Sequence, residues 1–130
     1  MKWYEIKEEK MDLEDAKDNK NDAILCYIPL LAFIPYFSKT DSKFVEFHTK
    51  QGMTLQLFEF LYMSIYIIFA QIRVTECSWG VCHKFLPLYV AIPINVILTL
   101  ILFLNVIGII NVCECKARKL PLIGRLELFK

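Results

Sequence analysis

The chain has 130 residues, of which 56% are apolar and 22% are charged, and its mean hydropathy is +0.43. Fifteen Lys and Arg against fourteen Asp and Glu leave a net charge of +1, which argues against a general nucleic-acid binder. Charged and apolar residues occupy separate stretches. The composition therefore predicts one small integral membrane domain, with the lipid bilayer as its partner and no nucleic-acid partner.

The first 22 residues are polar, with eight acidic residues and five lysines. This segment lacks the basic start and directly following apolar run of a secretory signal. Few of its side chains are apolar enough to be buried. The composition of residues 1–22 therefore favours a solvated, partly disordered acidic tail over a short surface helix.

Three apolar blocks follow, and we expect each to cross the membrane as a helix. The first, residues 23–38, is short for a hydrocarbon core about 30 Å thick, and it contains Pro29 and Pro35. A buried or re-entrant segment is the alternative for this block. The second, residues 51–72, is long enough to span, and a helix that runs into it is expected to start at Thr40, Asp41 or Ser42, which are all good N-cap residue types.

The third block, residues 86–112, carries no charge and would be about 40 Å long as a straight helix, so we expect it to tilt. A basic segment follows and is predicted to lie at the membrane surface. The sequence thus predicts an all-α integral membrane protein with three transmembrane helices in a membrane domain over residues 23–128. A polar N-terminal tail and a basic interfacial C-terminal segment flank the three helices.

The distribution of basic residues gives only a weak prediction of which side of the membrane each loop faces. Three spans place the N-terminus and the 73–85 loop on one side of the membrane, and the 38–50 loop and the C-terminal segment on the other. Lys and Arg are then almost evenly divided between the sides, so the positive-inside rule gives no contrast. The basic cluster after the third span favours an inside C-terminus. The expected location is multi-pass in the plasma membrane of a prokaryote.

The acidic residue inside the second span has the sharpest physical consequence. Burying the Glu59 charge in a span costs about 2.5–3.5 kcal/mol, and such residues are functional candidates. A proton, ion or substrate contact is one interpretation. The other is an interhelical hydrogen bond that fixes packing, with Asn95, Asn105 or Asn111 of the third span as its partner.

Two further polar residues lie near the start of the same helix. His48 is close to Glu59 in angular position, and Gln51 flanks that stripe. His48 could pair with an acid or a lipid phosphate, or be solvated. In a three-span chain, this turn and residues 119–124 lie on the same side. We therefore expect His48 or Gln51 to hydrogen-bond the backbone of 119–124.

Four of the five cysteines form two pairs, and Cys26 lies alone in the first apolar block as an apolar filler. Cys77 and Cys82 could form a disulfide in an oxidising compartment, or bind a metal together with His83. The third span separates them from Cys113 and Cys115 by about 40 Å, which argues against one zinc site and favours free thiols in the second pair. We predict no metal site and no cofactor. No catalytic motif is present, so an enzyme is not expected.

Two short motifs resemble those of a known family. FVEFHTKQG (44–52) and KLPLIG (119–124), in this order around apolar blocks, resemble small prokaryotic membrane proteins of unknown function described as similar to the chloroplast Tic-type import component. The matching positions include His48, Gln51, Lys119, Pro121 and Gly124. Glu46 departs from the basic residue usual in that family. The resemblance implies a channel-like or translocon-associated role by analogy.

The expected function is that of a structural or interaction subunit that packs through its polar helix faces with itself or with a membrane protein partner. The alternative is an oligomeric transport or protein-translocation component that resembles Tic-type import channels. Three spans can hardly enclose a water path, so transport requires several copies. A redox protein using Cys77, Cys82 and His83 is the third candidate.

Overall fold

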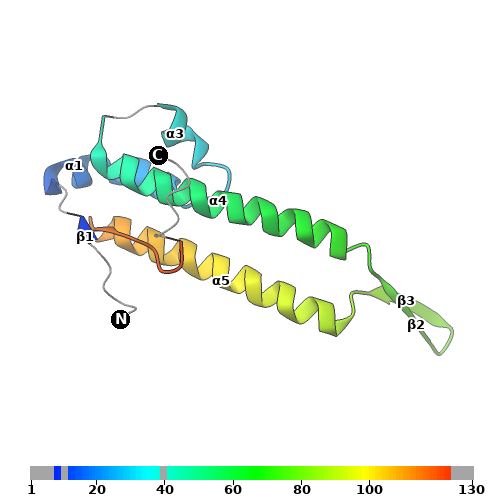
Figure 1. Ribbon diagram of the computed structural model, residues 1–130. Coiled ribbons are helices and arrows are strands. Elements are labelled where there is room, and N and C mark those ends of the chain that lie inside the picture. Colours follow the sequence, from blue (N-terminus) through cyan, green and yellow to red (C-terminus); the bar gives the residue numbers. More distant parts are fainter. Residues whose placement is uncertain (1–7, 10–11, 39–40, 124–130) are drawn as a thin grey trace.

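The body of the protein is a pair of long helices that run side by side in opposite directions (Figure 1). In this computed structural model they are α4 (Lys43–Phe69) and α5 (Leu88–Cys113). A hairpin joins them at one end, and the remaining elements gather at the other end, which we call the cap. The structure describes residues 8–9, 12–38 and 41–123.

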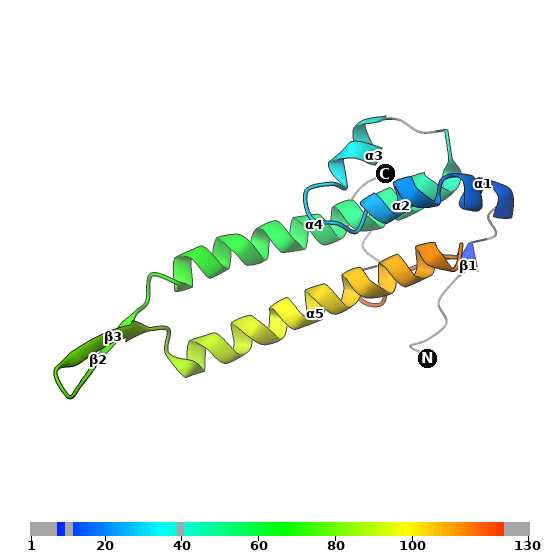
Figure 2. The same ribbon diagram turned by 180° about the vertical axis from the view of Figure 1, so that it is seen from behind.

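The cap contains three short helices and a minimal sheet, and Figure 2 shows the helices beside the first half of α4. The strands β1 and β4 pair antiparallel. The bounds are β1 (Glu8–Glu9), α1 (Leu13–Asp18), α2 (Lys20–Leu25), α3 (Phe33–Ser38) and β4 (Ala117–Arg118).

The three-span prediction is wrong, because two helices, not three, are long and apolar enough to cross a membrane in the described chain. The expected first span divides into α2 and α3, which are separated by turns over residues 26–32. Pro29 lacks a backbone donor, and Leu30 adopts a positive φ of 69°, so the helix cannot continue here. The segment turns back against α4.

The all-α prediction is also wrong, because the expected 73–85 loop is a β-hairpin. Strands β2 (Val74–Ser78) and β3 (Val81–Phe85) pair antiparallel. Trp79 and Gly80 form the two-residue turn with φ of 54° and 80°. Two positive φ values are what a type I′ turn requires, and that turn matches the twist of the strands. The fold is therefore mainly helical with small antiparallel sheets.

The polar segment that we expected to be solvated is helical from Leu13 onward and packs against the helix pair. Ala16 and Ala23 are completely buried. The Lys20 ammonium donates to the Cys113 carbonyl at the end of α5 over 2.9 Å. A cation there complements the negative end of the helix dipole. Alanine adds little to the hydropathy of this segment, but its small side chain lets α1 and α2 pack closely against the long helices.

The first turn of α4 is capped from two directions. Ser42 accepts a hydrogen bond from the Val45 N–H, and the Asp15 carboxylate of α1 accepts from the Phe44 N–H. Both acceptors satisfy donors that a helix start leaves without partners. Because Asp15 lies 29 residues from Phe44, its hydrogen bond to the Phe44 N–H also fixes α1 against the start of α4.

Burial divides the helix pair into two parts. The side chains near the cap, such as Tyr27, Phe44 and Val112, are buried. Toward the hairpin, large apolar side chains point outward, and Leu61 and Ile68 are 56% and 66% exposed. Continuous exposed apolar surface of this extent is typical of contact with lipid. The described fold therefore combines a packed cap with a pair of helices long and apolar enough to cross a membrane.

Candidate functional site

The centre of the cap is the side chain of Tyr27, which enters from the turn after α2 and lies against both long helices. Its hydroxyl is 2.8 Å from Nδ1 of His48 on α4. On α5, a Cβ atom at Gly108 would lie 2.2 Å from the Tyr27 ring, so only glycine leaves room for it. Burial raises the pKa of the Tyr27 hydroxyl, which keeps it neutral and able to donate.

His48 is fully buried, so neither the solvated state nor contact with lipid phosphate that the sequence left open describes it. The rings of Phe44 and Phe47 lie edge-on to its imidazole, with distances of 4.6 and 5.3 Å between the ring centroids. Nε2 has no hydrogen-bond partner among the described residues.

A second close contact joins α2 to α4 beside this tyrosine. A Cβ atom at Gly52 would lie 2.0 Å from the Cys26 carbonyl oxygen. The Cys26 thiol lies 3.3 Å from the Thr49 hydroxyl and is buried. Small residues at helix crossings allow such backbone approach in membrane proteins. Gly52 and Gly108 thus provide the space for two consecutive residues, Cys26 and Tyr27.

Gln51 connects the start of α4 to the chain after α5. Its Oε1 accepts from the Leu120 N–H over 3.1 Å, and its Nε2 donates to the Arg118 carbonyl over 3.4 Å. The hydrogen bond that the sequence analysis expected from His48 or Gln51 to this backbone is thus made by Gln51. Lys119 and Pro121 lie in the same segment, whereas Gly124 lies outside the described residues.

Glu59 belongs to a polar chain that links three parts of the protein. The Leu30 N–H donates to Gln56 Oε1 over 2.9 Å, and Gln56 Nε2 donates to Glu59 Oε2 over 2.9 Å. From α5, Asn105 Nδ2 donates to Glu59 Oε1 over 2.6 Å. Each carboxylate oxygen therefore has a donor, and the chain runs from the 26–32 turns through α4 to α5.

The other polar residues of α5 bond locally. The Asn95 amide donates to the Ala91 carbonyl one turn earlier, and the Thr99 hydroxyl donates to the Asn95 carbonyl. Asn111 is buried near the end of α5, where its backbone carbonyl accepts from the Lys116 N–H. Of the three candidate partners for Glu59, the structure thus places Asn105 in contact.

We expect Asn105→Leu to lower the free energy of unfolding, because Glu59 Oε1 loses its interhelical donor. Hydrogen bonds between membrane helices contribute about 0.6–1.7 kcal/mol, so the change should be of that order. Denaturation in detergent micelles, carried through a double-mutant cycle with Glu59→Leu, measures the coupling. Asn95→Leu is the matched control, because the Asn95 amide donates to a carbonyl of its own helix. Purely additive effects would contradict an Asn105–Glu59 link.

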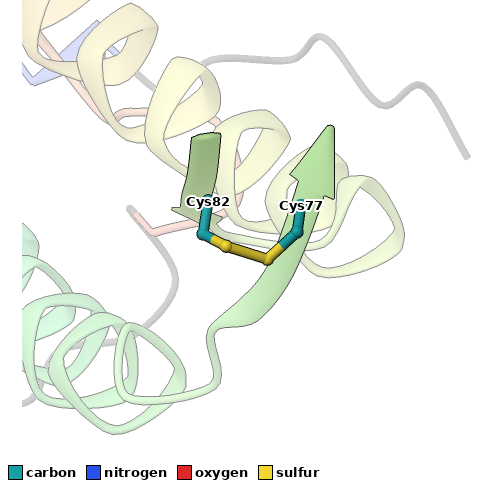
Figure 3. The surroundings of a disulfide bond; sticks show 2 residues. All are labelled: Cys77 and Cys82. Carbon is teal, nitrogen blue, oxygen red and sulfur yellow. A yellow bond between two sulfur atoms is a disulfide. The ribbon is translucent and has the colours of Figure 1, made fainter. Parts of the chain in front are cut away.

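The hairpin carries the disulfide between Cys77 and Cys82, which face each other across β2 and β3 (Figure 3). Successive residues of a strand point to opposite faces, so His83 lies on the other face from Cys82. The alternative of a metal site shared by these three residues is therefore not formed. Over residues 8–9, 12–38 and 41–123, no three His, Cys, Asp or Glu side chains group as metal ligands.

Sequence reasoning missed the two residues that occupy the centre of the cap, Cys26 and Tyr27. Both lie in an apolar block that length and hydropathy identify only as a span. Gln56, which joins Leu30 to Glu59, lies about 60° round the helix from Glu59 and so outside the stripe that contains His48 and Glu59. A tyrosine hydroxyl inside an apolar block is the one local signal, since it needs a buried partner.

Comparison with protein families identifies the chain. No curated protein and no solved structure matches it. The model of the magnetosome magnetite crystal formation protein family (MamF/MmsF) matches residues 18–127, which include α2, the hairpin and both long helices. The resemblance to Tic-type import components is therefore wrong, because short motifs around apolar blocks do not distinguish families of small membrane proteins. With most of its length matched, the chain belongs to the magnetosome magnetite crystal formation protein family.

Proposed function

We propose that this chain is a structural subunit of the membrane at which magnetite crystals form. The observation that carries the proposal is the family match over residues 18–127, together with a fold whose two long helices are suited to a bilayer.

The internal use of polar side chains supports a structural role over transport. In the apolar region, Gln56, Glu59 and Asn105 bond to one another and to the Leu30 backbone. These hydrogen bonds join the 26–32 turns, α4 and α5 to one another. In the cap, the Gln51 side-chain amide hydrogen-bonds the backbone of Arg118 and Leu120. These contacts hold the cap to the helix pair.

The two-helix topology also supports an orientation. Thirteen of the fifteen Lys and Arg residues precede Gly52 or follow Cys113, whereas Arg73 and Lys84 alone lie by the hairpin. Under the positive-inside rule, the cap faces the cytoplasm. The hairpin then faces the opposite compartment, where a disulfide persists only if conditions are oxidising. Charge and cysteine chemistry thus favour the same orientation.

Thiol labelling in right-side-out membrane vesicles tests this orientation. With a membrane-impermeant maleimide, we expect Cys77 and Cys82 to react only after reduction, and exposed Cys113 only after the vesicles are permeabilised. Cys26 is the internal control. Burial raises the pKa of its thiol to about 11, so it should react only after denaturation. Labelling of Cys113 in sealed vesicles would reverse the proposed orientation.

Deletion of the gene in the host tests the role in crystal formation. We expect electron microscopy to show magnetite crystals that are changed in number, size or shape. The wild-type gene should restore them, and so should a Tyr89→Phe control gene, because Tyr89 is exposed on α5. Unchanged crystals in the deletion strain, or a host without magnetite under any iron supply, would overturn the proposal.

A further inference from the structure

The surface between the two long helices contains an apolar groove of about 340 Å³ that is open on one side. It lies in the part of the helix pair that the cap helices leave uncovered, where the neighbouring apolar side chains point outward. The lining side chains are apolar except for the tyrosine hydroxyl; they are Phe58, Leu61, Tyr62, Ile65, Ile94, Ile97, Leu100, Ile101, Leu104, Leu122 and Ile123.

The chain after α5 forms one end of this groove. Gln51 holds the backbone at Arg118 and Leu120, and the turn that follows places Leu122 and Ile123 in the lining. The same short segment carries positive charge immediately before the turn. Residues 114–119 contain Lys116, Arg118 and Lys119 against the single acid Glu114, which pairs with Lys116 at 2.9 Å and lies 3.8 Å from Arg118.

Apolar space and positive charge are therefore adjacent in one structural unit. A basic site beside a crevice between membrane helices is the arrangement that binds anionic lipid headgroups. In the orientation proposed above, this end of the groove is at the cytoplasmic leaflet. An anionic phospholipid could place its phosphate at residues 116–119 and one acyl chain in the groove.

Charge argues against an apolar spanning helix as the occupant of the groove. Such a helix would cover the apolar lining but would bring no negative charge to the basic residues 116–119. An anionic phospholipid supplies both an acyl chain and a phosphate. An acyl chain is thin and flexible, and it matches an apolar lining without requiring hydrogen bonds.

We propose that the groove between α4 and α5 binds an acyl chain of an anionic phospholipid whose headgroup contacts the basic residues 116–119. The site rests on the membrane location of the helix pair and not on a role in magnetite formation. The lipid connects the C-terminal segment to the helix pair from the membrane side, as Gln51 does from inside the cap.

Retention of lipid by the purified protein tests the site. The full chain is extracted in mild detergent, and binding of dioleoyl phosphatidylglycerol and dioleoyl phosphatidylcholine is compared by native mass spectrometry. Ile97→Trp fills the groove, and Val96→Trp is its matched control, because Val96 faces outward beside the groove. Lys119→Gln weakens the basic end, and Lys84→Gln removes a charge at the hairpin instead.

We expect wild-type protein to retain phosphatidylglycerol several-fold more than phosphatidylcholine. Lys119→Gln should reduce this preference about fivefold, the equivalent of one basic residue near an anionic surface, while Lys84→Gln should not. Ile97→Trp should lose the bound lipid, and Val96→Trp should keep it. Equal retention of both lipids by the wild type, or full retention by Ile97→Trp, would overturn the site.

A measurement on the unmodified protein remains valid if Ile97→Trp fails to fold. Phosphatidylglycerol with a photoactivatable diazirine on its acyl chain should cross-link to Phe58–Ile65 and Ile94–Leu104. Cross-links spread evenly over the outer faces of the two helices would overturn the lipid site. Crystal formation in the host is scored separately, so failure of the lipid site and failure of the proposed function are distinguishable.

Discussion

Replacing Gly108 by alanine is expected to lower the free energy of unfolding by about 1–3 kcal/mol. The loss should lie in the upper part of this range, because the space beside Gly108 is filled. The added methyl group would lie 2.2–2.7 Å from three atoms of the Tyr27 ring. That ring is 2% exposed and its hydroxyl bonds to His48, so it cannot move aside without breaking this bond. Denaturation of the purified protein in detergent micelles measures the loss.

Val106→Ile is the matched control, since it also adds one methyl group to α5 but on a side chain that is 52% exposed. We expect its effect to be within about 0.5 kcal/mol. Gly52→Ala should behave like Gly108→Ala, because its Cβ would meet the Cys26 carbonyl at 2.0 Å. A Gly108→Ala protein as stable as Val106→Ile would mean that Tyr27 does not lie between the helices.

The second large effect is expected for Tyr27→Phe, which removes the hydroxyl and keeps the ring. Nδ1 of His48 would lose its partner, and Nε2 already has none among the described residues. A buried polar atom without a partner costs about 1–3 kcal/mol, so the free energy of unfolding should fall by that amount. Unfolding in micelles measures the change, with Tyr89→Phe, whose ring is 75% exposed, as the control.

The double variant Tyr27→Phe/His48→Leu distinguishes a lost hydrogen bond from lost packing. Because both polar partners are then replaced by apolar groups, we expect it to be less destabilised than the sum of the single variants. If the two single effects add without interaction, the hydroxyl and the imidazole do not depend on each other, and the bond at the centre of the cap is not formed.

The sequence by itself determined the two long helices. The uncharged third block predicts a helix over residues 86–112, and α5 covers Leu88–Cys113. The helix start expected at Thr40, Asp41 or Ser42 is also present, and it is the Ser42 side chain that caps α4. These features depend on local causes, namely the length of an apolar run and a capping side chain within three residues of the first turn. Local causes are visible in a single sequence.

The tertiary structure decided which apolar block does not form a helix long enough to cross a membrane. Residues 23–38 have the composition of a span, but Pro29 interrupts the helix and the Leu30 N–H finds an acceptor in Gln56, 26 residues away. The same applies to residues 12–23, where the buried side chains of Ala16 and Ala23 pack in the core. Hydropathy measures what a side chain prefers, not which partner is within reach.

The candidate site shows the same division. The sequence alone indicated that Glu59, His48 and Gln51 needed polar partners, because charge and hydrogen-bonding groups are costly in an apolar region. Which partners they have, Asn105 for Glu59 and Leu120 for Gln51, depends on the register of segments 46 and 69 residues apart. That register is set by close packing around Tyr27, Gly52 and Gly108, which only the folded chain brings together.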